Sequence, residues 1–235
     1  MDVINRMRSW LLALAFVATI GGSGPAVALT LFDGTFADAQ WVGTEFFDST
    51  PGQTGVFSAG QVGAGGNPGS YRLIYHEYTI GSYQTLHLSP LLTVDPSVVS
   101  IQALTIAFDV IAVALAQTFI PVLQQGGDVF EHGAFTAASS NWQSVSYAGL
   151  VAADFDRSLG TGSPDFSSSG ALITFGFIAA NTGTSPSLKV TEGGIDSYSV
   201  VIVPEPSTGF LLALGMCGVR VISRWRVSSS CRRAG

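Results

Sequence analysis

The body of this chain, residues 29–206, is a succession of apolar, β-branched segments separated by turns rich in glycine and proline. The segment from Val98 to Val113 is the longest, and apolar residues recur along it at every second position: Leu104, Ile106, Phe108 and Val110. A period of two places these side chains on one face of a β-strand. The body contains no convincing amphipathic helix. We therefore expect an all-β fold, an antiparallel β-sandwich.

Further strands are expected wherever a short apolar or alternating run lies between turn signals. They are Tyr71–Tyr78, Thr118–Leu123, Asp128–Phe135, Trp142–Tyr147, Ala171–Ala180 and Ile195–Val203. Residues 124–127, Gln-Gln-Gly-Gly, predict a hairpin between two of these strands. Residues 152–155 predict a single helical turn.

Residues 1–28 have the three parts of a secretory signal peptide. Two arginines precede an apolar run from Leu11 to Ile20, and Ala26 and Ala28 supply the small residues that a signal peptidase requires. A run of about ten apolar residues is too short to cross a membrane core of ~30 Å. We therefore expect an N-terminal signal helix, export through the Sec machinery and cleavage after Ala28. The alternative is a retained N-terminal anchor.

Residues 204–235 have the order expected of a membrane-directed tail. Pro204, Glu205 and Pro206 are followed by an apolar stretch from Gly209 to Val219. The prolines prevent the last strand from continuing. A basic tail follows, with Arg224, Arg226, Arg232 and Arg233. Because arginines stay on the cytoplasmic side, we expect a C-terminal transmembrane helix with the body outside the cell.

This combination of a Pro-Glu-Pro motif, an apolar helix and a basic end resembles the PEP-CTERM sorting signal. The resemblance implies recognition by an exosortase, a membrane protease-transpeptidase that would cut near the motif and release the body or re-attach it at the cell surface. Arg220 interrupts the apolar run after Val219 and leaves it short, which departs from the pattern. An ordinary single-pass anchor is the alternative. The expected domains are a signal peptide (1–28), a β-sandwich (29–203) and a sorting signal (204–235).

The order of landmarks in the body resembles jelly-roll sandwiches of the carbohydrate-binding and concanavalin-like type. The landmarks are Phe32–Phe36 before Trp41, Gly66–Tyr71, Phe175–Phe177 and Gly194–Val200. Such modules often hold a structural calcium between the first and last strands, so the resemblance implies Asp33 and Asp196 as candidate ligands. Calcium takes carboxylate oxygens. The alternative is that Asp33 belongs to a turn and Asp196 to a strand end.

Aromatic rings stack on the apolar faces of sugars, so exposed aromatic residues are candidate glycan contacts. The candidates are Trp41, Tyr71 and Trp142, with Tyr75 and Tyr78 as further members of the set. For each of them the alternative is packing in the core.

Charge and cysteine content exclude several classes of function. The body holds three basic residues, Arg72, Arg157 and Lys189, against fifteen acidic ones, a net charge of −12 that repels a phosphate backbone and excludes nucleic acid as a partner. Both cysteines, Cys217 and Cys231, lie in the tail, so the body has no thiol nucleophile and no cysteine-ligated zinc. No metal-ligand spacing, nucleophile elbow or nucleotide loop occurs. We expect no enzyme activity, and no cofactor other than the candidate calcium.

The sequence therefore predicts an exported, non-catalytic protein of the cell surface or extracellular matrix that associates with exopolysaccharide. A lectin-like carbohydrate-binding module with specific glycan recognition is the alternative. A glycan-degrading enzyme is the third hypothesis, and it would require two carboxylates across a cleft. The membrane is expected as a partner only through the C-terminal helix, before that helix is processed.

Overall fold

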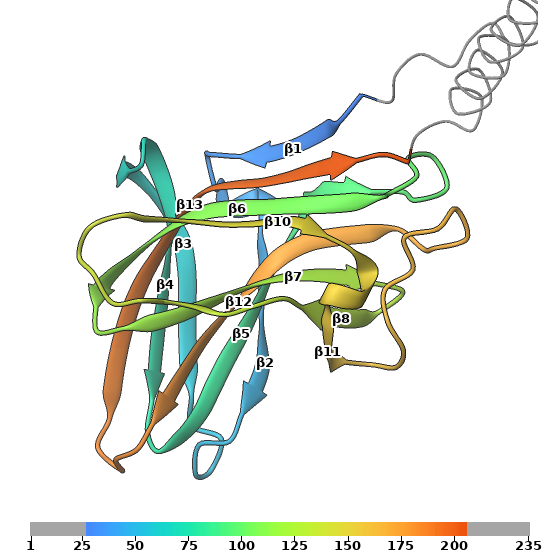
Figure 1. Cartoon of the computed structure of the whole chain (residues 1–235). Coiled ribbons are helices and arrows are strands. Elements are labelled where there is room, and N and C mark those ends of the chain that lie inside the picture. Colours follow the sequence, from blue (N-terminus) through green and yellow to red (C-terminus); the bar gives the residue numbers. More distant parts are fainter. Residues whose placement is uncertain (1–26, 206–235) are drawn as a thin grey trace, which may run out of the picture. The chain divides into compact units, whose positions relative to one another are not determined.

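The two-sheet sandwich predicted from the sequence is confirmed. A computed structural model describes residues 27–205. Thirteen strands in this range form two sheets that pack face to face, and two short 3-10 helices lie between strands (Figure 1). Every strand pairing in this range is antiparallel.

We call the first sheet sheet A. Its six strands are β1 (Leu29–Asp33), β3 (Val56–Gly66), β4 (Gly69–Tyr78), β6 (Ala103–Ala114), β10 (Gln143–Leu150) and β13 (Lys189–Val203). The order is β10-β6-β13-β4-β3, and β1 pairs with β13.

The second sheet, sheet B, has seven strands. They are β2 (Val42–Asp48), β5 (Gly81–Val94), β7 (Gln117–Gln125), β8 (Asp128–Glu131), β9 (Phe135–Ala137), β11 (Asp156–Leu159) and β12 (Ile173–Gly183). The order is β11-β8-β7-β12-β5-β2, and β9 pairs with β7. The helices are η1 (Asp38–Gln40), before β2, and η2 (Ala152–Asp154), before β11.

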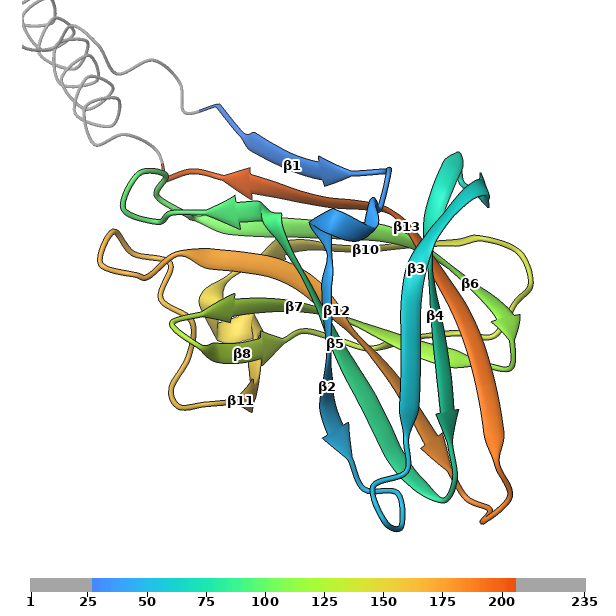
Figure 2. The same cartoon turned by 180° about the vertical axis from the view of Figure 1, so that it is seen from behind.

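Strand β13 joins the two ends of the domain. One side of β13 pairs with β6 along most of its length, and the other side pairs first with β4 and then with β1. Because Leu29 lies opposite Ile202, the first and last strands lie side by side, as Figures 1 and 2 show. Residues Ala28 to Pro204 form one compact unit.

The core between the sheets is built from the alternating side chains that the sequence indicated. Leu104, Ile106, Phe108 and Val110 are all buried. An aromatic group packs against them, consisting of Phe36, Trp41, Phe119, Phe177 and Tyr198. The Tyr198 hydroxyl donates to the carbonyl of Gly176 at 2.6 Å, which ties sheet A to sheet B.

The predicted strands all exist, with shifted ends. The hairpin over residues 124–127 is confirmed by the pairing of Gln125 with Asp128, and the predicted helical turn is η2. The expected strand 128–135 is divided into two. Its first part is β8, which pairs with the end of β7, and its last residue begins β9, which pairs with the start of β7. Strands β1, β2, β3, β5 and β11 had not been predicted.

Several predictions fall on residues outside the described range. These are the signal peptide with Ala26, the apolar C-terminal stretch, Pro206 and the basic tail. Among residues 27–205, no helix has the length and apolarity needed to cross a membrane. Pro204 and Glu205 directly follow the end of β13.

Candidate binding groove

A groove crosses the outer face of sheet B, the face that points away from the core. It encloses about 430 Å³. Five strands contribute to its lining: β2 supplies Phe46 and Phe47, β5 Gln84, β7 Ile120, β8 Glu131, and β11 Ser158 and Leu159. With neighbouring strands about 4.8 Å apart, the six strands from β2 to β11 span about 24 Å. The groove therefore has the reach to hold an extended chain.

A β-bulge in β2 directs two consecutive phenylalanines into this groove. Glu45 lies opposite Thr85 and Phe47 lies opposite Gln84, so Phe46 is an extra residue on the β2 side of the ladder. Adjacent residues of a regular strand point to opposite faces, and a bulge re-aims a side chain. The Phe47 side chain is 49% exposed, whereas Phe46 packs against the groove floor.

The floor of the groove is a second, smaller apolar cluster. Its buried members are Leu86, Val122, Val129 and Ile178, and they are flanked by Phe46, Leu88, Ile120 and Ala180. Strands of sheet B are therefore apolar on both faces at this point. The cluster contributes no polar side-chain atoms to the groove.

The lining of the groove includes three polar side chains, those of Gln84, Glu131 and Ser158. The Ser158 hydroxyl is buried and has no hydrogen-bond partner within the described residues. The side chains of Gln84 and Glu131 also line the groove and are half-buried. These two side chains can hydrogen-bond to a ligand in the groove, whereas the Ser158 hydroxyl lies beneath the surface. Aromatic walls with a few free polar groups are typical of small-molecule and glycan sites.

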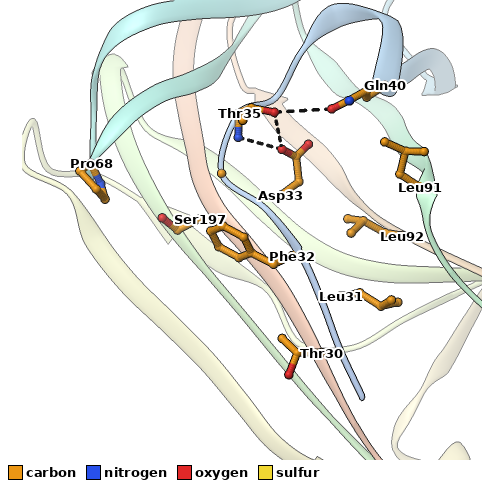
Figure 3. A pocket seen from close by; sticks show the side chains of 11 residues that line it. Thr30, Leu31, Phe32, Asp33, Thr35, Gln40, Pro68, Leu91, Leu92 and Ser197 are labelled. Carbon is orange, nitrogen blue, oxygen red and sulfur yellow. Dashed lines mark hydrogen bonds between the residues drawn. The ribbon is translucent and has the colours of Figure 1, made fainter. Parts of the chain in front are cut away.

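A second hollow lies along β1 and encloses about 650 Å³ (Figure 3). Phe32, 63% exposed, and Leu91, 60% exposed, lie on its walls. Two of its polar side chains are engaged within the protein: the Thr35 hydroxyl donates to Asp33, and the Ser197 hydroxyl donates to the carbonyl of Asn67. This hollow is larger than the groove, and its lining includes one phenylalanine where that of the groove includes two.

The structure places Trp41 in the core, 4% exposed, where its ring stacks on Phe36. Its indole nitrogen donates to Asp33 Oδ2 at 2.7 Å. The prediction that Trp41 contacts a glycan is therefore wrong, because no face of the ring is available. The alternative stated for this residue, packing in the core, is what the structure shows.

Tyr71 and Trp142 lie together on the outer face of sheet A, half-buried, with ring centroids 5.4 Å apart. They therefore belong to a different face from the groove. Tyr78, in contrast, is 5% exposed.

The carboxylate of Asp33 organises the turn that follows β1. It accepts hydrogen bonds from the backbone amides of Thr35 and Phe36, from the Thr35 hydroxyl and from the Trp41 indole. Burial alone would raise the pKa of Asp33, but these bonds outweigh it and lower the pKa. The turn role offered as the alternative to calcium binding accounts for all of these contacts.

Asp196 lies at the point of β13 between its pairings with β4 and β1. Its carboxylate accepts from the backbone amides of Asn67 and Ser197. Burial raises its pKa, and the nearby charges of Asp109 and Asp33 add to the rise. Residues 27–205 contain no group of three or more His, Cys, Asp or Glu side chains placed to hold a metal. Calcium binding by Asp33 and Asp196 stays a prediction.

A buried polar network lies behind the groove, on the core side of β5. Asn181 Oδ1 accepts from His76 Nδ1 at 2.8 Å, from Thr191 at 3.0 Å and from Gln117 at 3.2 Å. Because this oxygen only accepts, His76 Nδ1 carries a proton and Nε2 accepts from the Thr85 hydroxyl at 2.8 Å. The Thr85 oxygen in turn accepts from His87 Nε2 at 2.9 Å.

Both histidines of this network are fully buried and neutral. Burial lowers the pKa of His76 to about 4, although the hydrogen bond with Asn181 acts in the opposite direction. Burial also lowers the pKa of His87 well below its usual value, and the positive charge of Arg72 adds to the effect. These side chains support the fold and do not reach the groove, so they are not placed to act as catalytic bases there.

No family model matches the chain, and no curated protein matches it. Solved structures with a similar fold include a family 11 carbohydrate-binding module from Clostridium thermocellum in complex with a β-1,3-1,4-mixed-linked tetrasaccharide. Its TM-score is 0.47 at 15% identity, over 76% of this chain and 97% of that chain.

Two further similar structures are carbohydrate-binding modules. A family 30 module of a Clostridium thermocellum cellulosomal cellulase gives a TM-score of 0.44 at 14% identity, over 72% of this chain and 96% of that chain. A module described as recognising mannan gives a TM-score of 0.41 at 7% identity, over 76% of this chain and 99% of that chain. Because each TM-score lies below 0.5, we base no conclusion about this chain on what these modules bind.

Proposed function

We propose that this chain is an exported, non-catalytic glycan-binding protein whose body binds a polysaccharide chain in the groove of sheet B. The bulge in β2 is the observation that carries the proposal. It points Phe46 and Phe47 into a groove whose lining also includes the polar side chains of Gln84 and Glu131.

The chemistry of a sugar chain matches this lining. A pyranose ring has apolar C–H faces that stack on aromatic rings, and hydroxyls around its edge that need hydrogen-bond partners. The phenylalanines supply the stacking surface, while the Gln84 amide and the Glu131 carboxylate supply donors and acceptors. Glu131 and the acidic body disfavour an anionic polymer, so the ligand is a neutral polysaccharide.

A glycan screen tests this proposal. The protein is titrated with soluble neutral polysaccharides, such as mixed-linked β-glucan, mannan and xylan, and the products are examined for cleavage. Phe47→Ala and Phe46→Ala are each expected to weaken binding about tenfold, because each removes a stacking ring. Phe32→Ala is the matched control, since it removes an exposed phenylalanine from the other hollow.

Three outcomes would contradict the proposal. They are no saturable binding to any neutral glycan, equal loss of binding in the Phe32→Ala control, and release of shortened chains, which would indicate a hydrolase.

We also propose that the chain reaches the cell surface through its two terminal segments. The residue patterns of 1–28 and 204–235 support this, as does the match between their boundaries and the compact unit from Ala28 to Pro204. In this scheme the Sec machinery exports the chain, the C-terminal helix holds it in the membrane, and an exosortase processes it near Pro204–Pro206. Mass spectrometry of the native protein is expected to give a chain that begins at Leu29 and lacks the basic tail. An intact chain in the cytosolic fraction would refute the scheme.

A further inference from the structure

A line of aromatic side chains runs over the outer face of sheet A, on the opposite side of the sandwich from the groove. In β4 the side chains of Arg72, Ile74 and His76 are buried, so Tyr71 and Tyr75, which alternate with them, point outward. Trp142, just before β10, lies against Tyr71. We call Tyr71, Tyr75 and Trp142 the aromatic stripe.

The rings of the stripe are held in place by the protein itself. Trp142 donates from its indole nitrogen to the carbonyl of Gly65 at 3.0 Å, and the Tyr71 ring meets it edge-on. Gly194 lies beneath Tyr71, where a Cβ would come within 2.9 Å of the ring. The Tyr75 hydroxyl donates to Glu77 at 2.8 Å. Because these side chains are already fixed, binding would cost little conformational entropy.

We propose that the aromatic stripe is a second binding surface for a neutral polysaccharide. Tyr71 and Tyr75 are four residues apart on one strand, about 13 Å along it, so they can stack on two separate sugar rings of one chain.

The charges around the stripe select the polymer. Glu192 lies opposite Tyr75 in the pairing of β13 with β4, and Glu77 accepts a hydrogen bond from the Tyr75 hydroxyl. The basic residues of the body lie elsewhere: Arg72 is buried on the core side, Lys189 pairs with Tyr78 at the far end of the strand, and Arg157 is on β11. A polymer of uronic acids or sulfated sugars would be repelled.

Two binding surfaces on opposite sheets would let one molecule hold two polysaccharide strands. This consequence rests on the function proposed above, whereas binding at the stripe does not. Holding two strands of one network raises the overall affinity through effective concentration. The protein would then cross-link a polysaccharide matrix as well as bind it.

Depletion from solution by insoluble neutral polysaccharides tests the stripe directly. The probes are microcrystalline cellulose and an insoluble β-1,3-glucan, and the proteins are the wild type, Tyr71→Ala/Tyr75→Ala, Tyr71→Phe/Tyr75→Phe, and the groove variant Phe46→Ala/Phe47→Ala. Leu73→Ala is the matched control, because it removes a side chain from the same face between the two tyrosines without removing a ring. Circular dichroism confirms that each variant is folded.

We expect the double alanine variant to bind at least about tenfold more weakly, and the double phenylalanine and Leu73→Ala variants to bind like the wild type. The groove variant is expected to keep binding the insoluble probe, so failure of the groove and failure of the stripe are distinguishable. The proposal is overturned if the wild type binds neither probe, or if the double alanine variant binds as tightly as the wild type.

Discussion

Acidification should destabilise this protein well above the pH range in which its carboxylates titrate, because His76 and His87 are buried in the neutral form. In the unfolded chain a histidine binds a proton with a pKa near 6.5, whereas the pKa of His76 in the folded protein is about 4. Between these values the unfolded state holds more protons than the folded state. The free energy of unfolding is therefore highest above pH 6.5 and falls as the pH drops towards 4.

The size of the effect follows from the shift. For one histidine whose folded pKa is near 4, lowering the pH from 7 to 5 removes about 2 kcal/mol of stability. The pKa of His87 is lowered in the same direction. His87 should add to the loss in the same direction, and the roughly 2 kcal/mol from His76 alone is already a sizeable share of the roughly 5–15 kcal/mol typical of a domain.

Urea unfolding followed by tryptophan fluorescence at pH 7, 6 and 5 measures this directly. The variant His76→Gln removes one titrating group, so the fall in the free energy of unfolding between pH 7 and 5 should be about 2 kcal/mol smaller than in the wild type, whatever its stability at pH 7. A free energy of unfolding that is constant within error from pH 7 to 5, or an unchanged slope in His76→Gln, would refute the reasoning.

Two further predictions concern the core. Trp41→Phe should cost about 1–3 kcal/mol in urea unfolding, because it leaves Asp33 Oδ2 buried without its indole donor; no measurable change would contradict the role given to that bond. Gly176→Ala should be destabilising by about 1–3 kcal/mol or more, since its Cβ would lie 2.0 Å from the carbonyl oxygen of His87, whereas Gly63→Ala, with nothing within 4 Å, should be tolerated. Equal melting temperatures for these two glycine variants would show that the close approach is not real.

The sandwich was predictable because strands such as β6 bury one face and expose the other, so their apolar residues alternate. The hairpin between β7 and β8 was likewise predictable, because two consecutive glycines, Gly126 and Gly127, form its turn. Strand β3 was missed because it is rich in glycine and carries few apolar side chains. The short strands β1 and β11 lack the length that makes a pattern recognisable.

The groove could not be predicted, because it depends on which strands become neighbours and on a bulge. Phe46 and Phe47 are adjacent, and alternation alone would place them on opposite faces. Glu131 and Ser158 reach the groove only through the pairing of β8 with β7 and with β11. Trp41 was misassigned because a tryptophan near a turn looks the same in sequence whether its ring is exposed or buried.

Mapping a bound glycan by the amide chemical shifts of the protein tests the central claim most directly. Titration with the tightest soluble polysaccharide should produce saturable shifts at Phe47, Gln84, Ile120, Glu131 and Ser158, while the residues of β1 stay unchanged. Shifts that gather along β1 and its hollow instead, or no saturable shift on sheet B, would contradict the account.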